Sequence, residues 1–322
     1  MFEIGFPVSA KDGEKRRALL PVDIARIAHP ECMFLEQGYG APLGIADDAY
    51  IQAGANIASR GEVLSKPIIC EPKAGDADYL GELRGKTVFG WIHAVQNRDI
   101  CDALTAGGNT VYAWEDMYGE DGVHTFHMNN RIAGKAALKH ACECCGMTLE
   151  GRRVAVLGRG NCACGAIDYI NAHGGTAVQF LRNQEKEFNR RLPEFDIIVN
   201  AIKWDPMRKD HIIYREDLTR MRRGTLIVDI SCDRHGGIES SEPTSISNPT
   251  YAVDGIIHYA VDNTPSLLYE EATAAISHEL PPFLNHLVEG TACKELDDAL
   301  IIREGVILDR KIIDFQKGQG VL

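Results

Sequence analysis

The chain has 322 residues, of which 45% are apolar, 25% charged and 7% aromatic, a composition typical of a folded globular protein rather than a disordered or fibrous one. Its length exceeds what one hydrophobic core usually organises, so we expect two domains. The 34 Lys and Arg residues are outnumbered by 46 Asp and Glu, and the net charge of −12 disfavours nucleic acid and anionic membrane surfaces as partners.

Short apolar runs alternate with helical patterns in the N-terminal part of the chain. The runs typical of strands are 2–7, 33–38, 67–72 and 86–94, and a helix opening at Pro21 is expected over 21–29. This alternation is typical of βαβ units and predicts a parallel sheet.

A long helix rich in small residues is predicted over 129–145, with an Asn that can cap its start and Gly146 at its end. A second α/β series follows. Its apolar runs are typical of strands buried on both faces of a parallel sheet, and they cover 152–158, 176–181, 195–202 and 224–231.

The C-terminal part is expected to return to the first domain. Residues 266–287 have an amphipathic helical pattern that Pro281 and Pro282 interrupt. The predicted fold is therefore α/β, with two Rossmann-like, doubly wound parallel sheets and a cleft between them. We expect a discontinuous substrate domain, 1–128 plus 266–322, and a dinucleotide-binding domain, 129–265.

Ten cysteines are present, but the sequence lacks an apolar targeting segment and a run of membrane-spanning length, so we expect reduced thiols and a cytoplasmic protein. The group His140, Cys142, Cys144 and Cys145 resembles a metal site at first. Only His140 and Cys144 would share a helix face, and no second pair of zinc spacing follows. Buried, inert thiols are favoured, and no metal is expected.

A glycine motif joins a strand to a helix at 158–165. Gly158 permits the tight turn, Gly160 leaves room for a pyrophosphate, and Ala163 allows close packing of helix on strand, as in G-x-G-x-x-A dinucleotide sites. The alternative is a glycine-rich turn without a ligand. We assign three further residues to the same cofactor site, namely Asn161, Asn200 and Ala201.

The choice of cofactor is predicted from the end of the next strand. An NAD site usually has a carboxylate there for the ribose 2′-hydroxyl, whereas this strand is followed by Leu181, Arg182 and Asn183. A guanidinium suits a 2′-phosphate, so NADP(H) is favoured over NAD(H). The alternative is that Arg182 is a solvated surface charge.

Four residues could carry the chemistry of a substrate site. Arg16 could bind a carboxylate bidentately, Lys73 follows a buried strand, His93 could exchange protons near neutral pH, and Asp233 follows the carboxyl end of a strand, where α/β sheets bind ligands. Taken singly, each has an ordinary structural explanation as an exposed, core or turn residue.

Together these motifs resemble a known family. They are E-K-R-R-A-L-L-P at 14–21, W-I-H-A at 91–94, N-N-R-I-A-G-K-A-A at 129–137, the glycine loop, and I-S-C-D-x-x-G-G-I-E-S-S at 230–241. Their order and spacing resemble those of alanine dehydrogenases and the related transhydrogenases and saccharopine dehydrogenases. Within that group the chain is most similar to N5-(carboxyethyl)ornithine synthases, through N-T-P-S-L at 263–267, the G-x-G-N-x-A-x-G loop and the missing ribose acid.

The resemblance implies roles for particular residues. Arg16 matches the arginine that binds the carboxylate of a 2-oxo acid, His93 the histidine near the reacting carbon, Asp233 the acid after a late strand of the nucleotide domain, and Asn263 a substrate-binding asparagine at the domain junction. One position departs from the pattern. Alanine dehydrogenases have a substrate-binding Lys before the Glu-Pro pair, where this chain has Cys70, and Lys73 is the candidate replacement.

The implied activity is NADPH-dependent reductive condensation of a 2-oxo acid, expected to be pyruvate, with the side-chain amine of ornithine or lysine. Alternatives are an alanine dehydrogenase, a saccharopine dehydrogenase-like enzyme or, in another class, a non-catalytic nucleotide-binding sensor. The partners expected are the small-molecule substrates and, from the habit of the family, further copies of the chain in a homo-oligomer.

Overall fold

The computed structural model describes residues 1–205, 207–233 and 236–318. The chain divides into two compact units. One comprises Met1–His127 together with the chain from Tyr269 onward, and the other comprises Met128–Leu268. The first unit is therefore discontinuous, as predicted, because the C-terminal segment returns to it.

The first unit contains a sheet in the order β14-β13-β6-β5-β4-β1-β2-β3. From β3 to β6 all neighbours are parallel, whereas β13 pairs antiparallel with β6 and with β14. The C-terminal hairpin thus extends an otherwise parallel sheet. The strands are β1 (Ile4–Phe6), β2 (Met33–Glu36), β3 (Asn56–Ala58), β4 (Ile68–Cys70), β5 (Thr87–Gly90), β6 (Thr110–Ala113), β13 (Leu300–Arg303) and β14 (Val306–Ile307).

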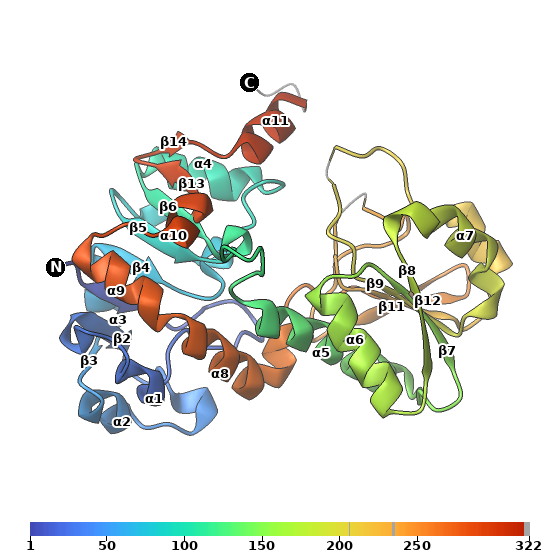
Figure 1. Cartoon of the computed structure of the whole chain (residues 1–322), viewed down its shortest axis with the longest axis horizontal. Coiled ribbons are helices and arrows are strands. Elements are labelled where there is room, and N and C mark those ends of the chain that lie inside the picture. The colour runs from blue at the N-terminus through green and yellow to red at the C-terminus, as the bar shows by residue number, and fades with distance from the viewer. Residues whose placement is uncertain (206, 234–235, 319–322) are drawn as a thin grey trace. The chain divides into compact units, whose positions relative to one another are not determined.

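Helices from both ends of the chain cover this sheet, and Figure 1 shows the orange and red C-terminal helices beside the blue and cyan elements. They are α1 (Pro21–Ile24), α2 (Asp47–Gln52), α3 (Arg60–Ser65), α4 (Arg98–Ala106), α8 (Tyr269–Glu279), α9 (Pro281–Glu289), α10 (Lys294–Ala299) and α11 (Arg310–Gly318).

The helix predicted over 21–29 is wrong beyond Ile24. The chain continues in tight turns in which Arg26 N donates to Asp23 O and Ile27 N donates to Ile24 O. The segment then meets Pro30, whose ring disfavours helical backbone in the preceding residue. The Pro281-Pro282 pair has the expected effect, because α8 ends at Glu279 and α9 begins at Pro281.

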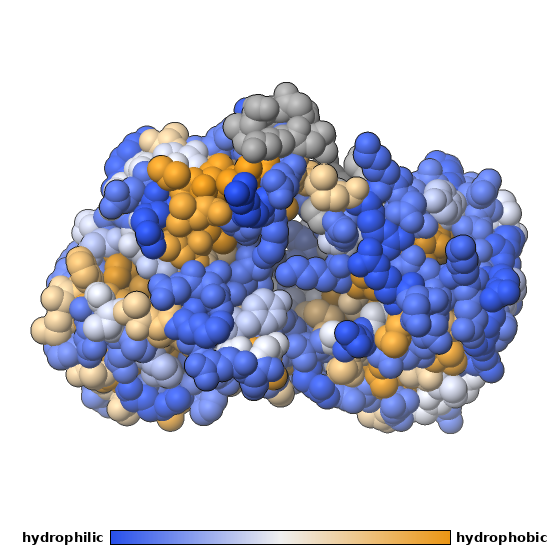
Figure 2. Space-filling model, turned by 45° about the horizontal axis from the view of Figure 1, so that its top comes forward, coloured by the Kyte–Doolittle hydropathy of each residue, from blue (hydrophilic) through white to orange (hydrophobic). Residues whose placement is uncertain are grey.

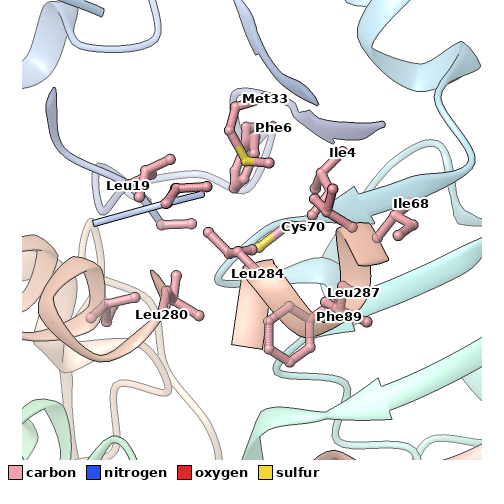
Figure 3. Close-up of a cluster of buried hydrophobic side chains, with 14 of the residues drawn as sticks. Ile4, Phe6, Leu19, Met33, Ile68, Cys70, Phe89, Leu280, Leu284 and Leu287 are labelled. Carbon is pink, nitrogen blue, oxygen red and sulfur yellow. The ribbon is translucent and has the colours of Figure 1, made fainter. Parts of the chain in front are cut away.

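The main core of the first unit lies between its sheet and the C-terminal helices (Figure 3). Leu280, Leu284 and Leu287 pack against strand residues from β1, β2, β4 and β5. Burial of aliphatic side chains in this way stabilises by about 1.5–3 kcal/mol each. The labelled members of the cluster are Ile4, Phe6, Leu19, Met33, Ile68, Cys70, Phe89, Leu280, Leu284 and Leu287.

The second unit contains a sheet in the order β11-β12-β10-β9-β7-β8, parallel except for β11. Its central strands β9 and β10 are buried along their whole length, as their continuous apolar runs predicted. The elements are β7 (Arg153–Leu157), β8 (Thr176–Phe180), β9 (Ile197–Asn200), β10 (Leu226–Asp229), β11 (Thr250–Val253), β12 (Ile256–Tyr259), α5 (His127–Cys145), α6 (Asn161–Ala172) and α7 (Glu185–Arg190).

Helix α5 packs closely on α6 through glycines. A Cβ on Gly165 would lie 1.9 Å from Arg131 O, and one on Gly134 would lie 1.9 Å from Cys162 O, so only glycine permits this approach. The helix begins at His127 rather than at residue 129. Asn129 is buried inside it, so the prediction of a capping Asn there is wrong.

Figure 2 shows a largely hydrophilic surface with an apolar patch on the first unit. Among the described residues, no helix combines the length and apolar character needed to span a bilayer.

Candidate active site

The candidate substrate residues of the first unit follow the carboxyl ends of adjacent parallel strands. β1 lies between β2 and β4 in the sheet, so chain connections diverge at this point, which is where open α/β sheets bind their ligands. Arg16 lies on the loop after β1, Lys73 follows β4, and His93 follows β5. The fold therefore brings these three predicted residues to one edge of the sheet.

Arg16 is held by Glu14. The Arg16 Nε donates to Glu14 Oε1 at 2.9 Å and Nη2 donates to Oε2 at 2.6 Å, while the Arg16 backbone N–H also donates to Oε1. The guanidinium lies 5.2 Å from the ring centre of Trp91. Burial alone would raise the pKa of Glu14, but Arg16, with help from Lys73, lowers it, so Glu14 is an anion that fixes the fork of Arg16.

Arg17 has a different place. Its Nε donates to Tyr39 O and its Nη1 to Arg16 O, and its backbone N–H donates to Thr273 Oγ1. Arg17 therefore joins the N-terminal loop to the core, and of the two neighbouring arginines Arg16 is the candidate for substrate binding.

The loops after β4 and β5 run side by side. Trp91 N donates to Pro72 O, and Gly75 N donates to Trp91 O at 2.9 Å. A Cβ on Gly75 would lie 2.1 Å from Ile92 O, so a glycine is needed for this close approach. The pairing of the two loops carries Lys73 and His93 to the same place, although they are twenty residues apart.

Lys73 is buried and paired with Asp76, its Nζ lying 3.0 Å from Asp76 Oδ2. Lys11 Nζ lies 3.2 Å from the same oxygen. Burial would raise the pKa of Asp76, but the two lysines lower it, so it is ionised at neutral pH. Asp76 was absent from the sequence-based predictions because the sequence does not indicate which of its many acids meets Lys73.

His93 has a left-handed backbone, with φ of 55°, which is uncommon for a residue other than glycine and marks a constrained position. Glu115, which follows β6, holds it. Glu115 Oε1 accepts from His93 N at 2.6 Å and Oε2 accepts from Ile92 N at 3.1 Å, while Asn97 Nδ2 donates to His93 O. Sequence reasoning missed Glu115, which lies in no recognisable motif.

The charge state of His93 follows from its neighbours. Part of its surface is open to solvent, yet the protein around the imidazole withdraws it from water and lowers its pKa, Glu115 opposes this shift, and Lys73 adds to it. His93 is therefore mostly neutral at pH 7 and can accept a proton.

In the second unit, the glycine loop joins β7 to α6 as predicted. Gly158 has φ of 109°, a backbone conformation that favours glycine. The first hydrogen bond of α6 runs from Cys164 N to Gly160 O, so the amides of Asn161, Cys162 and Ala163 have no acceptor within the helix. Space around Gly160 is open. These amides and this space fit a dinucleotide pyrophosphate.

Arg182 follows β8, the strand paired with β7. Its side chain is exposed and has no hydrogen-bond or ion-pair partner in the part of the chain that the structure describes. Gln179 Nε2 donates to Gly158 O at 2.9 Å, which ties the end of β8 to the glycine loop. Arg159, on that loop, is also exposed and is a second cation that the sequence analysis did not single out.

Asn200 ends β9, the strand on the other side of β7, and Ala201 follows it. Ala201 lies beside the glycine loop, since a Cβ on Gly158 would be 2.7 Å from Ala201 O. The Asn200 side chain is buried, and its Nδ2 donates to Asp229 Oδ1 at 2.9 Å, within the second unit. Asn200 thus supports the loop after β10.

That loop carries Asp233. Cys232 has a left-handed φ of 52°, and its backbone N–H donates to Asp229 Oδ1. Asp233 lies four residues after the strand end and is half-buried. Asn263, between β12 and the turn at Thr264–Leu268, is buried, and its Nδ2 has no hydrogen-bond partner among the described residues.

All ten cysteines are free thiols, but of the three at 142, 144 and 145 that were expected to be buried only Cys142 is, because Cys144 is exposed and Cys145 is half-buried. Cys144 Sγ lies 3.4 Å from His140 Nε2, and His140 Nδ1 lies 3.0 Å from the Tyr259 hydroxyl. Helix spacing explains the pair, because residues four apart share a face.

The chain matches the two sequence families described as alanine dehydrogenase/PNT, N-terminal domain, over residues 5–133, and alanine dehydrogenase/PNT, C-terminal domain, over residues 133–314. An N(5)-(carboxyethyl)ornithine synthase of Clostridium botulinum is 31% identical over 85% of this chain and 91% of its own length. The enzyme of the same name from Lactococcus lactis is 30% identical over 85% of this chain and 93% of its own length. An alanine dehydrogenase of Mycobacterium tuberculosis is 24% identical over 96% of this chain and 95% of its own length.

Solved structures give the same fold. An L-alanine dehydrogenase structure has a TM-score of 0.82 at 21% identity, covering 98% of this chain and 99% of its own. A transhydrogenase of Sinorhizobium meliloti has a TM-score of 0.76 at 18% identity, covering 94% and 99%. The two α/β units and the resemblance predicted from the motifs are confirmed, and the chain belongs to the alanine dehydrogenase/PNT family of NAD(P)-dependent oxidoreductases.

Proposed function

We propose that the chain catalyses NADPH-dependent reductive condensation of a 2-oxo acid, with pyruvate favoured, and the side-chain amine of ornithine or lysine. The observation that carries this proposal is the meeting of Arg16, Lys73 and His93 at one sheet edge in a chain about 30% identical to two enzymes named N(5)-(carboxyethyl)ornithine synthase. In the reaction, the amine nitrogen forms a bond to C2 of the oxo acid, water leaves, and hydride and a proton saturate the C=N bond.

Arg16 and Lys73 are proposed to bind the oxo-acid carboxylate. Glu14 holds the Arg16 fork in one orientation. The buried Lys73 contributes positive charge from the loop after β4, three positions after Cys70, where alanine dehydrogenases have their lysine. Fixing the carboxylate also fixes C2, and such orientation can contribute several kcal/mol to the lowering of a barrier, about 7 or more in favourable cases.

His93 is proposed to move protons. Because its lowered pKa leaves the imidazole neutral, His93 can take the proton that the attacking amine loses and return it to the departing hydroxyl group. General acid–base catalysis of this kind typically contributes about 10²–10⁴-fold. Asp233 is proposed to balance the positive charge on the iminium nitrogen, and the orphan Nδ2 of Asn263 to donate a hydrogen bond to the substrate.

The second unit is proposed to bind NADP(H) in preference to NAD(H). NADPH supplies the hydride for the reduction. The free amides of Asn161–Ala163 suit its pyrophosphate, and the exposed Arg182, in place of an acid, suits a 2′-phosphate. Arg159 adds a further positive charge on the glycine loop.

The test is a product analysis by mass spectrometry over a matrix of amines and 2-oxo acids with NADPH. The amines are ornithine, lysine and ammonia, and the oxo acids are pyruvate and 2-oxoglutarate. We expect a secondary amine from pyruvate with ornithine or lysine. Alanine formed from ammonia, without any condensation product, would make the chain an alanine dehydrogenase and refute the proposal, as would the absence of any reduced product.

A further inference from the structure

A charged cluster of Lys73, Asp76 and Lys11 lies beside the proposed oxo-acid site, and the reaction described so far gives a role to Lys73 alone. Asp76 Oδ2 is shared between Lys73 Nζ at 3.0 Å and Lys11 Nζ at 3.2 Å. The side chain of Asp76 is 35% exposed, that of Lys11 16% and that of Lys73 7%. The acid is therefore the most accessible of the three, and an open carboxylate lies next to an ammonium group.

The cluster is built on the same loops as the site. Lys11 and Arg16 belong to the loop after β1, and a turn joins them, in which Glu14 N donates to Lys11 O at 3.1 Å around Gly13 with φ of 73°. Asp76 ends the short helical turn Ala74–Asp76 that follows Lys73. The charges of Lys73, Asp76 and Lys11 all act on the His93 imidazole, which places them within electrostatic reach of the proposed proton carrier.

The proposed oxo acid does not need this arrangement. Its single carboxylate is accounted for by Arg16 and Lys73, and an acid facing the same position would repel it. The other substrate has the complementary chemistry, because an amino acid that reacts through its side-chain amine keeps a carboxylate and an ammonium group on its α-carbon. A zwitterion of this kind is recognised by a cation and an anion placed side by side.

We propose, on the basis of the proposed function, that Lys11 and Asp76 bind the α-carboxylate and the α-ammonium group of the amino-acid substrate, whose side-chain amine reacts beside His93. The pair is then a specificity site for diamino acids. It selects against ammonia, which has neither group, and against simple alkylamines, which lack the carboxylate. Lys73 lies between the two recognition sites and contacts Asp76 on one side.

Three amines separate the two contacts. Ornithine has both α-groups, 5-aminopentanoate keeps the reacting amine and the carboxylate but lacks the α-ammonium group, and 1,4-diaminobutane keeps an ammonium group but lacks the carboxylate. The variants are Asp76→Asn and Lys11→Met. The matched control is Asp78→Asn, which removes an acid from the nearby ion pair with Arg60, outside the cluster.

We expect Asp76→Asn to lower kcat/KM for ornithine and 1,4-diaminobutane by roughly 10–100-fold, the loss typical of a charged hydrogen bond, and to leave 5-aminopentanoate nearly unchanged. Lys11→Met should do the converse: it should lower kcat/KM for ornithine and 5-aminopentanoate and leave kcat/KM for 1,4-diaminobutane nearly unchanged. Asp78→Asn should leave kcat/KM for all three amines unchanged. Dissociation constants of the amines, measured by calorimetry on the full chain with NADP⁺ present, should follow the same pattern without requiring turnover.

The outcomes are distinct. If Asp76→Asn lowered kcat/KM equally for all three amines, Asp76 would act only by positioning Lys73. That result, or unchanged selectivity among the amines in both variants, would overturn the inference while the proposed function stands. If the two variants showed the expected selective losses of amine binding but the wild-type chain formed no condensation product, the inference would stand and the proposed reaction would be overturned. Failure of ornithine and lysine either to bind or to react would overturn both.

Discussion

Replacing Glu14 with Gln should destabilise the first unit strongly. The side chains of Glu14 and Arg16 are 0% and 3% exposed, and two hydrogen bonds of 2.9 and 2.6 Å join them. A glutamine oxygen can accept only one of these bonds, and its amide group then faces an N–H donor of the buried guanidinium. Breaking a buried ion pair on one side typically costs 3–5 kcal/mol, so we expect a loss of about 3 kcal/mol, roughly a hundredfold in the unfolding equilibrium.

The chain contains a matched control. Arg191 and Glu194 form the same fork, with Nε to Oε1 and Nη2 to Oε2 both at 3.0 Å, but at the surface, where exposed pairs contribute little. Glu194→Gln should therefore leave stability unchanged. For Glu14→Gln, urea unfolding followed by tryptophan fluorescence in a Trp204→Phe background reports on the first unit, because the remaining tryptophans, Trp91 and Trp114, both lie there. Glu194 lies in the second unit, so the unfolding of its variant is followed by far-ultraviolet circular dichroism, which reports on the helices and strands of both units.

The pH dependence provides a second check. Because Arg16 lowers the pKa of Glu14 in the folded state, the stabilisation by the carboxylate is present above its unfolded pKa and is lost as the pH falls through the folded value. The gap in stability between wild type and Glu14→Gln should therefore narrow in acid. A gap below about 1 kcal/mol at pH 7, or one that does not change with pH, would refute the assignment of a buried ion pair.

Three further predictions concern other residues. Glu115→Gln leaves one of the two backbone amides at 92 and 93 unpaired, so kcat should fall about 10-fold or more with little change in KM for the oxo acid. Since Glu115 raises the pKa of His93, the acid limb of the kcat profile should also move to lower pH, and an unshifted limb would contradict this. Arg182→Gln should raise KM for NADPH about 10-fold or more and leave KM for NADH unchanged; equal changes for both cofactors would exclude a 2′-phosphate contact. Burial raises the pKa of Glu71 from 4.5 to about 6 in the folded state, so the protein loses stability as the pH rises from the unfolded pKa through the folded one. Glu71→Gln should therefore gain about 2 kcal/mol relative to wild type between pH 4.5 and pH 8, and unfolding curves that keep a constant separation would count against a buried, proton-binding Glu71.

The local pattern of the sequence was sufficient for the fold class and for the glycine loop. Continuous apolar runs such as 197–200 and 226–229 form strands buried on both faces, because apolar periodicity is a property of neighbouring residues. The glycine loop is likewise recognised from contiguous residues between one strand and one helix. Its open amides are inherent in a helix N-terminus, so no distant part of the chain is needed to predict them.

The partners of the candidate site residues depend on contacts distant in sequence. Glu115 reaches His93 from another strand end, Asp76 gathers Lys11 and Lys73, and Asn200 turns to Asp229. A chain with 46 acidic residues offers many possible pairings, and the one that forms is the one for which backbone loops meet at the carboxyl edge of a sheet. The residues whose side chains could bind substrate or transfer protons can be identified from the sequence. Their charge states and partners are decided only where strands far apart in sequence become neighbours, because electrostatic interaction depends on distance in space.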